Sequence, residues 1–497
     1  MNYYSTRDKK TARDWASAIA LGLSPDGGLF VPEAFPVLTE KQLASLLSMR
    51  YPERAAYVMG LFLNGLSGKR LSSITEKAYG RFDTAAVAPT VRLDDDTWLL
   101  ELWHGPTCAF KDIALQILPY LLTDALAAAG EKRKVCILVA TSGDTGKAAL
   151  EGFKDVPGTK IMVFYPKDGV SAIQELQMRS QEGENVSVCG VTGNFDDAQT
   201  GVKVIFNDES FRKELTEAGW MLSSANSINW GRLLPQIVYY FSAYCDLVGA
   251  GRIRTGDAVN FCVPTGNFGD ILAGFYAKKM GLPVKKLICA SNRNNVLTDF
   301  IRTGTYDRNR KFYTTISPSM DILVSSNLER LIFELSGKND GQTGAYMAAL
   351  SETGSYTVSP EIQEKLRDAF ACGFCPDPET KAAIGDVFRE SRYLMDPHTA
   401  VAYRVLEEYR RETGDRTVSV VVSTASAFKF CDSVLSALGK EPKITGTGLI
   451  GELERETGFD APAPILRLKN SSVRFSGVAD KDQLLPAVRS FICGEQG

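Results

Sequence analysis

Histidine is scarce in this sequence, which contains only His104 and His398 among its 497 residues. Serine and cysteine hydrolases need an imidazole placed beside the nucleophile, so only two positions are open to such a site. A zinc site built from cysteine and histidine lacks ligands for the same reason. Chemistry that depends on histidine side chains is therefore disfavoured.

The sequence also lacks the spacing of a disulfide framework. Its ten cysteines stand singly, mostly in apolar runs such as "VCILV" and "NFCVP", as small buried hydrophobic residues do. Cys372 and Cys375, in "CGFC", are the one close pair, and we expect them to serve helix packing. We expect no bound metal.

No excess of charge and no long apolar run is present. The net charge is −3, which gives no electrostatic reason to expect nucleic acid or an anionic membrane as a partner. The start, "MNYYSTRDKKTARDW", lacks the apolar core of a signal peptide, and no stretch is long enough to span a bilayer. We expect a cytoplasmic protein whose partner is a small molecule.

Short apolar strands alternate with helical stretches in two parts of the chain, residues 134–192 and 258–425, on either side of "SSANSINWGR". This alternation predicts an α/β fold with two doubly wound three-layer domains forming a cleft, preceded by a mainly helical domain. The expected divisions are an N-terminal domain (1–95), a large domain (96–111 and 255–445), a small domain (112–254) and a C-terminal extension packing on the large domain (446–497).

The loop in "LVATSGDTGKAAL", residues 138–150, resembles an ATP-binding loop but fails its test. The Walker pattern requires glycine where Thr141 stands and serine or threonine where Ala148 stands. An ATP-dependent kinase is therefore disfavoured, although backbone amides at a helix start still suit an anion. Lys147 is expected to be solvated. Similar loops follow strands at 264–270 and 423–426, which suggests a phosphorylated cofactor that supplies the chemistry.

Lys111 lies in an apolar setting, in "ELWHGPTCAFKDIALQIL". Burial lowers the pKa of an amine, which an imine-forming lysine needs. The alternative is a lysine that extends to solvent from a helix edge.

Five motifs in this order, "HGPTCAFKD", "ATSGDTGKAA", "SANSINWGRLLPQI", "PTGNFGDILAG" and "DPHTAVAY", resemble threonine synthase. This is a family of pyridoxal-phosphate (PLP) enzymes with the tryptophan-synthase-β type of fold. "YYSTRDKK" and "SPDGGLFVPE" resemble the N-terminal domain of its bacterial and fungal branch. The resemblance runs from about residue 3 to 440 and is loose beyond.

The resemblance implies the cofactor and the residues around it. Lys111 matches the catalytic lysine that forms an imine with PLP, and Thr424 matches a threonine that bonds the pyridine nitrogen. The cofactor-binding set implied is Lys111, Asp144, Gly266, Asn267, Phe268, Gly269 and Thr424, of which 266–269 take the phosphate.

The resemblance also implies O-phospho-L-homoserine as substrate, converted with water to L-threonine and phosphate. The loop with Ser142, Asp144 and Thr145 matches the one that holds the amino-acid end of the substrate. Asn226, Ser227 and Arg232 match residues associated with the substrate phosphate, and an arginine beside polar donors suits phosphate chemically.

Ser426 and Ala427 depart from the family's usual pattern, which has His-Pro after the first alanine of this loop. His104 is expected to orient substrate, and His398 to cap or pack a helix. A threonine or serine dehydratase of the same fold and a non-catalytic binding relative remain as alternatives, and we expect a monomer or a homodimer.

Overall fold

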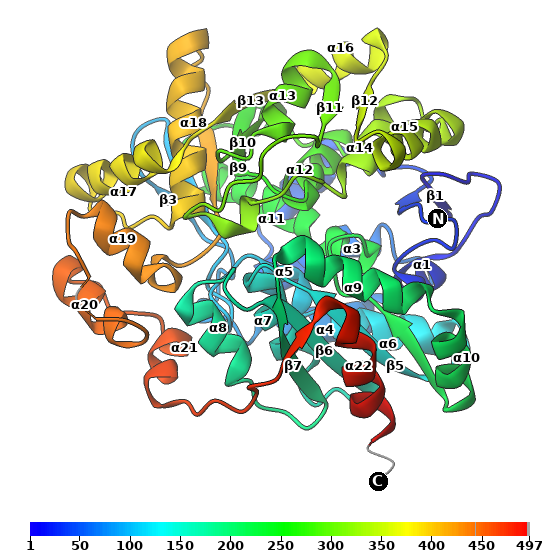
Figure 1. The fold of residues 1–497 in the computed structure, drawn as a ribbon. Coiled ribbons are helices and arrows are strands. Elements are labelled where there is room, and N and C mark those ends of the chain that lie inside the picture. The colour runs from blue at the N-terminus through cyan, green and yellow to red at the C-terminus, as the bar shows by residue number, and fades with distance from the viewer. Residues whose placement is uncertain (443, 495–497) are drawn as a thin grey trace.

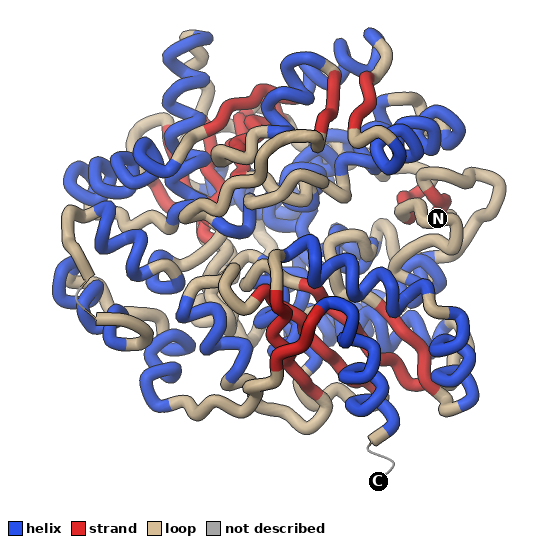
Figure 2. The backbone as a smooth tube through the Cα atoms, viewed as in Figure 1, coloured by secondary structure: helices blue, strands red, loops and turns tan. Residues whose placement is uncertain are grey.

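Two open sheets, each covered by helices on both faces, form the upper and lower halves of the molecule (Figures 1 and 2). The structure is a computed structural model that describes residues 1–442 and 444–494. The strand orders are β13-β10-β9-β14-β4-β3 in the larger sheet and β15-β7-β6-β5-β8 in the smaller one. All pairs are parallel except β3 with β4. The predicted fold class is confirmed.

The strands are short and mostly buried on both sides. The larger sheet comprises β3 (Thr90–Arg92), β4 (Thr97–Glu101), β9 (Val259–Pro264), β10 (Val284–Ser291), β13 (Phe370–Phe374) and β14 (Ser419–Ser423). The smaller sheet comprises β5 (Lys134–Ala140), β6 (Thr159–Pro166), β7 (Val186–Thr192), β8 (Trp220–Ser223) and β15 (Val478–Asp480).

Alternate side chains of the larger sheet enter two separate cores. Phe261 and Val263 of β9 lie in one core and Cys262 in the other, as the two-residue period of a strand requires. The first face packs against α11 (Trp230–Gly249), α12 (Gly269–Lys279), α13 (Val296–Thr303) and α16 (Pro360–Ala369). The second lies under α18 (Pro397–Thr413), with α17 (Asp377–Ser391), α19 (Cys431–Ala437) and α20 (Gly448–Thr457) around it.

The smaller sheet follows the same rule. Ile137 and Val139 of β5 face the central core, whereas Cys136 and Leu138 face the outer one. The central side carries α7 (Asp144–Phe153), backed by α5 (Lys111–Leu115), α6 (Leu118–Ala128) and α8 (Ala172–Arg179). The outer side carries α9 (Phe195–Asn207), α10 (Glu209–Glu217) and α22 (Leu484–Cys493).

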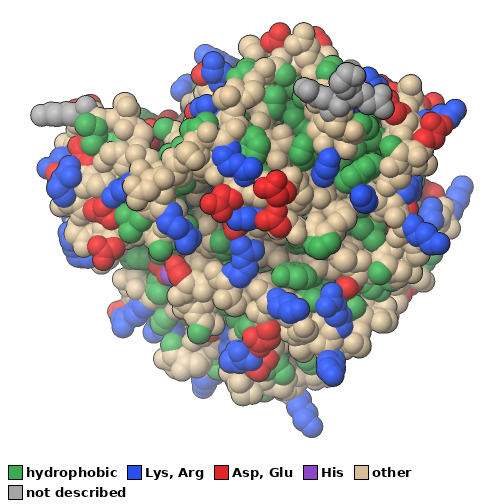
Figure 3. Space-filling model, turned by 90° about the horizontal axis from the view of Figure 1, so that it is seen from below, with side chains coloured by type: hydrophobic (Ala, Val, Ile, Leu, Met, Phe, Trp, Pro, Cys, Tyr) green, Lys and Arg blue, Asp and Glu red, His purple; other side chains and the backbone are tan. Residues whose placement is uncertain are grey.

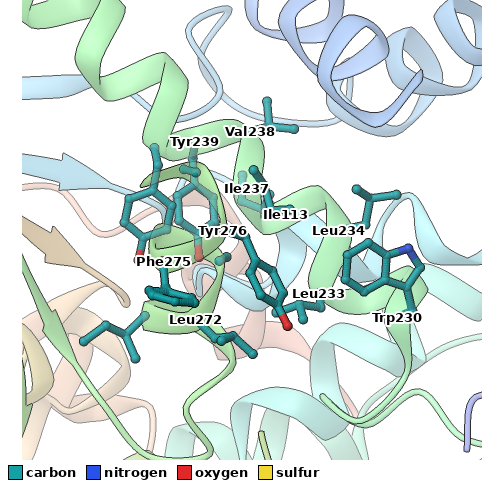
Figure 4. Packing of buried hydrophobic residues seen from close by; sticks show 14 of the residues in the cluster. Ile113, Trp230, Leu233, Leu234, Ile237, Val238, Tyr239, Leu272, Phe275 and Tyr276 are labelled. Atoms are coloured by element: carbon teal, nitrogen blue, oxygen red, sulfur yellow. The ribbon is translucent and has the colours of Figure 1, made fainter. Parts of the chain in front are cut away.

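Helix α11 joins the two halves and is buried along most of its length. Figure 4 shows its Trp230 beside Tyr276 of α12, and Tyr239 and Phe275 belong to the same buried cluster. The N-terminal region packs on it through α3. That region contains α1 (Trp15–Leu21), α2 (Glu40–Leu46), α3 (Tyr51–Gly60), α4 (Gly68–Tyr79) and the antiparallel pair β1 (Tyr3–Ser5) and β2 (Phe30–Pro32), which the mainly helical prediction did not include.

The C-terminal segment reaches both halves, whereas we expected it on the large domain alone. Helix α20 packs with α19 of the upper half, but β15 then pairs with β7 and α22 lies on α9 of the lower half (Figure 1). The remaining elements are β11 (Thr305–Asp307), β12 (Ser355–Thr357), α14 (Leu328–Leu335), α15 (Asp340–Glu352), α21 (Ala463–Leu466) and the 3₁₀ turns η1 (Pro318–Met320), η2 (Ala427–Lys429), η3 (Arg467–Asn470) and η4 (Lys481–Gln483).

Cys372 belongs to β13 and Cys375 follows that strand. Both pack against helices as expected, because Sγ of Cys372 lies 3.5 Å from the carbonyl oxygen of Thr298 on α13 and Sγ of Cys375 lies 3.3 Å from the hydroxyl of Thr380 on α17. Within residues 1–442 and 444–494, no group of three or more acidic, cysteine or histidine side chains is arranged to hold a metal ion. The helices of the same ranges include none with the length and apolarity needed to cross a membrane. On the face drawn in Figure 3, acidic and basic side chains lie interspersed.

Candidate active site

A cavity of about 720 Å³ lies between the two halves, beside the carboxyl ends of β5, β9 and β14. In a parallel sheet these ends carry the loops that bind ligands. The structure brings the predicted site residues together here: its walls include Lys111, Ser142, Thr145, Asn226, Ser227, Arg232, Gly266, Asn267, Phe268, Gly269 and Thr424. Asp144 lies directly behind this wall, with Oδ2 3.9 Å from Nζ of Lys111.

Lys111 is the first residue of α5, and the loop before it is held on both sides. Phe110 donates its amide to the carbonyl of Thr424 at 2.8 Å, which ties the loop to the end of β14. Asp112 accepts hydrogen bonds from the amide and hydroxyl of Thr107, both at 2.8 Å. These hydrogen bonds fix the backbone from which the Lys111 side chain extends. The side chain itself is only 10% exposed.

Asp144 lies between two buried lysines. Its Oδ1 is 2.7 Å from Nζ of Lys429 and accepts a hydrogen bond from Gln174 at 2.8 Å. Burial alone raises the pKa of this carboxyl, but the charges of Lys429 and Lys111 outweigh burial and hold the pKa well below its usual range. Asp144 is therefore a fixed negative charge beside Lys111.

Burial lowers the pKa of the Lys111 amine to about 8. Asp144 opposes the lowering, whereas the positive charges of Arg232 and Lys429 add to it. The predicted low pKa of Lys111 thus has a structural cause. A lysine extending to solvent is excluded, because the side chain is buried.

Residues 266–269 form a turn between β9 and α12 whose carbonyl groups point back into the protein. The carbonyl of Gly266 accepts a hydrogen bond from Ser325, and that of Asn267 accepts two from Asn327. Phe268 takes a left-handed conformation with φ of 61°. Within the ranges that the structure describes, no protein group accepts a hydrogen bond from the amides of residues 266–269.

This turn fits a phosphate group. Unbonded amides at the start of an eleven-residue helix, together with the positive end of its dipole, are suited to a dianion. A Cβ atom added to Gly266 would lie 2.6 Å from the carbonyl oxygen of Ser319, so a side chain there would displace the facing turn η1. The chemistry of the donor set therefore matches the phosphate of PLP.

Arg232 and Asn226 form a second polar set in the same cavity. Nη1 of Arg232 donates to the carbonyl of Ala225 at 2.9 Å and Nη2 to the hydroxyl of Thr145 at 3.4 Å. Among the described residues, neither Nε of Arg232 nor Oδ1 of Asn226 has a hydrogen-bond partner, although both are buried. Burial lowers the pKa of Arg232 to about 10, so it stays positive at neutral pH. A buried cationic donor left unpaired indicates a missing partner, here an anion.

His398 lines the cavity, which the sequence analysis did not expect. Its Nε2 accepts the amide of Ser319 at 3.2 Å, and Nδ1 lies 2.7 Å from Oδ1 of Asp396. The cap of α18 is made by Asp396 and not by His398. The structure thus uses the imidazole to hold η1 over the glycine turn.

Other expectations are corrected. His104 is absent from the cavity wall and lies between Asp83 and Glu101, so it does not face a substrate there. Lys147 is not solvated: it is 14% exposed, with Nζ 3.3 Å from Glu151. Ser426, which replaces the family's histidine, caps η2 by accepting the amide of Phe428. Lys429, Gln174 and Ser319 are site residues that the sequence analysis missed.

Comparisons with known proteins agree with this geometry. The family model "Threonine synthase N terminus" matches residues 2–79, "Pyridoxal-phosphate dependent enzyme" matches 85–425, and "Threonine synthase, C-terminal" matches 399–491. Threonine synthase of Pseudomonas aeruginosa is 42% identical over 446 residues, which cover 89% of this chain and 92% of that protein. Human threonine synthase-like 1 is 43% identical over 86% of this chain, but this chain spans only 58% of its length.

Solved structures give the same result. The crystal structure of PLP-bound threonine synthase from Brucella melitensis is 38% identical and superposes with a TM-score of 0.86 over 99% of both chains. Yeast threonine synthase is 32% identical with a TM-score of 0.88, again over 99% of both chains. The chain belongs to the threonine synthase family of PLP-dependent enzymes.

Proposed function

We propose that this protein is a PLP-dependent threonine synthase, which converts O-phospho-L-homoserine and water to L-threonine and phosphate, the last step of threonine biosynthesis. The observation that carries the proposal is that, among the described residues, the amides of the glycine turn and the buried Nε of Arg232 are two separate sets of anion donors without a protein partner, arranged around one buried lysine. The glycine turn (266–269) suits the phosphate of the cofactor, and Arg232 with Asn226 suits the phosphate of the substrate.

The residues that would hold PLP are Lys111, residues 266–269, Thr424 and Asp144. When bound, PLP supplies an electron sink for negative charge that develops on carbon atoms of the substrate. The Thr424 hydroxyl, which lines the cavity, would offer a neutral partner to the ring nitrogen. Asp144 supplies a fixed negative charge beside Nζ of Lys111.

Lys111 moves the proton at the substrate Cα. An amine whose pKa is about 8 is neutral in a useful fraction near neutral pH and still basic enough to accept a proton. Because Lys111 is the first residue of α5 and its loop is tied to β14, the amine is held in place for this transfer.

Arg232, with Asn226 and Ser227, selects a phosphorylated substrate. Homoserine would leave the buried Nε of Arg232 unpaired, which costs about 1–3 kcal/mol for each such group. Ser142 and Thr145 face the same cavity and would bind the amino-acid end of the substrate. A dehydratase acting on free serine or threonine would have no use for the arginine set.

We further propose the division into an N-terminal domain (1–95), a large cofactor domain (96–111 and 255–445) and a small domain (112–254). The C-terminal extension (446–497) then bridges the last two. A cytoplasmic monomer or homodimer acting on small molecules without nucleic acid completes the proposal.

The test is to load the purified protein with PLP, add O-phospho-L-homoserine and follow phosphate and threonine together. Equal amounts of both products are expected, and Lys111→Ala should abolish both because it removes the amine that carries the cofactor and the proton. Formation of 2-oxobutanoate from added L-threonine, with no phosphate released from O-phospho-L-homoserine, would contradict the proposal and indicate a dehydratase.

A further inference from the structure

Lys429 is a buried charge that the proposed reaction does not use. It lies at the end of η2, after the strand β14, and is fully buried. Its Nζ donates to the carbonyl of Thr107 at 2.8 Å and lies 2.7 Å from Oδ1 of Asp144. One ammonium group therefore connects three segments: the lysine loop before α5, the start of α7 in the lower half, and the end of β14 in the upper half.

The two oxygens of Asp144 serve different neighbours. Oδ1 takes the contacts with Lys429 and Gln174, while Oδ2 is 3.9 Å from Nζ of Lys111 and 3.5 Å from the hydroxyl of Ser319. Because Lys429 is close enough for a strong ion pair, most of the attraction of the carboxylate is directed away from Lys111. Lys111 receives a longer and weaker contact from the same group.

We propose that Lys429 is a positioning residue, which holds the Asp144 carboxylate by its Oδ1 and thereby prevents Asp144 from closing into a tight ion pair with Lys111. The catalytic amine is then free to bond the cofactor and to accept a proton. This inference rests on the proposed function, because it assigns Lys111 that role.

The charges around Lys111 come from four elements, and their directions agree with the proposal. Asp144 of α7 and Asp270 of α12 favour its protonated form, whereas Arg232 of α11 and Lys429 of η2 oppose it. Removing Lys429 deletes one opposing charge and also frees Asp144 to approach. Both changes favour the protonated form of Lys111, so the two effects add.

The experiment adds PLP to the apoprotein at a series of pH values and follows the rate at which the yellow colour appears, a signal that does not depend on turnover and that reports the free Lys111 amine. In Lys429→Met the midpoint of this pH profile should rise by about one pH unit or more, because an opposite charge at this range shifts a pKa by that much. At fixed neutral pH, kcat should fall about tenfold, since one pH unit changes the neutral fraction by that factor. KM should change by less than about threefold, because Lys429 does not line the substrate cavity.

Repeating the substitution of Lys429 in an Asp144→Asn variant distinguishes a positioning role from a general loss of structure. In the presence of Asp144→Asn, adding Lys429→Met should move the midpoint much less, because the carboxylate that Lys429 holds is absent. Equal shifts in both backgrounds, or no shift in either, would overturn the inference. If Lys429→Met does not fold, Lys429→Gln gives the same comparison, because its amide retains one donor for Thr107 or Asp144.

Failure of the inference is distinguishable from failure of the proposed function. A protein that does not become yellow with PLP, or that releases no threonine, contradicts the function. A yellow, active enzyme whose midpoint is insensitive to Lys429 contradicts only the positioning role.

Discussion

Arg232 is the residue whose role is tested most directly by substitution. Arg232→Met should raise KM for O-phospho-L-homoserine by about 30-fold or more, because a buried charge-assisted hydrogen bond to phosphate is worth about 2 kcal/mol. Inhibition by inorganic phosphate should weaken in parallel. Steady-state kinetics with and without phosphate measure both effects.

Arg404→Met is the matched control for Arg232, since Arg404 lies on α18 with its guanidinium 3.1 Å from Glu407 and is absent from the cavity wall. Arg404→Met should leave unchanged both the KM for O-phospho-L-homoserine and the inhibition by inorganic phosphate. An Arg232→Met enzyme with the KM of the parent would place the substrate phosphate elsewhere.

Asp270 makes stability depend on pH. Burial raises its pKa to about 6, while Tyr239 and Tyr240 donate to Oδ1. Because this pKa lies above the value of about 3.9 in an unfolded chain, the folded form binds the proton more tightly, and stability falls as pH rises from about 4 to 6. Asp270→Asn keeps an acceptor for both tyrosines and removes the titration.

The expected outcome for Asp270→Asn is a gain in stability relative to the parent that is about 1 kcal/mol larger at pH 7.5 than at pH 5. Urea unfolding at the two pH values measures it. Asp482→Asn, at an exposed position, should show no such difference. An equal gain at both pH values would show that Asp270 does not titrate in this range.

The turn from β9 into α12 shows how one element creates a site. Gly266→Ala should weaken PLP binding about tenfold or more while the protein stays folded, because the new methyl group would meet the carbonyl of Ser319 at 2.6 Å and move η1. Binding is followed by titrating the apoprotein with PLP.

Gly344→Ala is the matched control for Gly266. Gly344 lies within α15, and an added Cβ there meets nothing within 4 Å. It should leave PLP binding unchanged and stabilise the helix by about 0.5–1 kcal/mol. Equal PLP affinity in both variants would contradict the role of the close contact at Gly266.

Sequence reasoning succeeded where elements are long and periodic and failed where a contact joins distant segments. Buried strands such as β5 and β9 were recognisable because they are apolar and end in glycine-rich loops. Strand β15 was missed, because three residues carry no period and its partner β7 lies almost 300 positions earlier. The pairing of Lys429 with Asp144 could not be predicted for the same reason, because a lysine among apolar residues does not indicate which distant carboxylate it contacts. His398 was expected to cap or pack a helix: the cap belongs to its neighbour Asp396, while the buried imidazole packs against Phe430.

At the scale of the whole molecule, residues 446–494, here called the strap, connect the upper half to the lower half (Figure 1). Ending the chain after Ser471 would uncover α9, which lines the cavity and packs under Leu484 and Val488. Loss of two such buried side chains costs about 3–6 kcal/mol.

The expected result of this truncation is a lower melting temperature and a raised KM, measured by calorimetry and kinetics. Cys493→Ser, a change at an exposed position of α22, should affect neither. A truncated chain with the stability and KM of the parent would show that the strap has no part in holding α9.

The parallel pairing of β4 with β14 has a consequence for how the protein is made. Lys111 leaves the ribosome more than 300 residues before Thr424 and Lys429, the groups that anchor its loop and its carboxylate neighbour. At typical rates of synthesis this interval lasts roughly 15–60 s. During that time the reactive amine belongs to a chain without a finished pocket, so the cofactor joins late in synthesis, and a chain that ends before Thr424 cannot retain it.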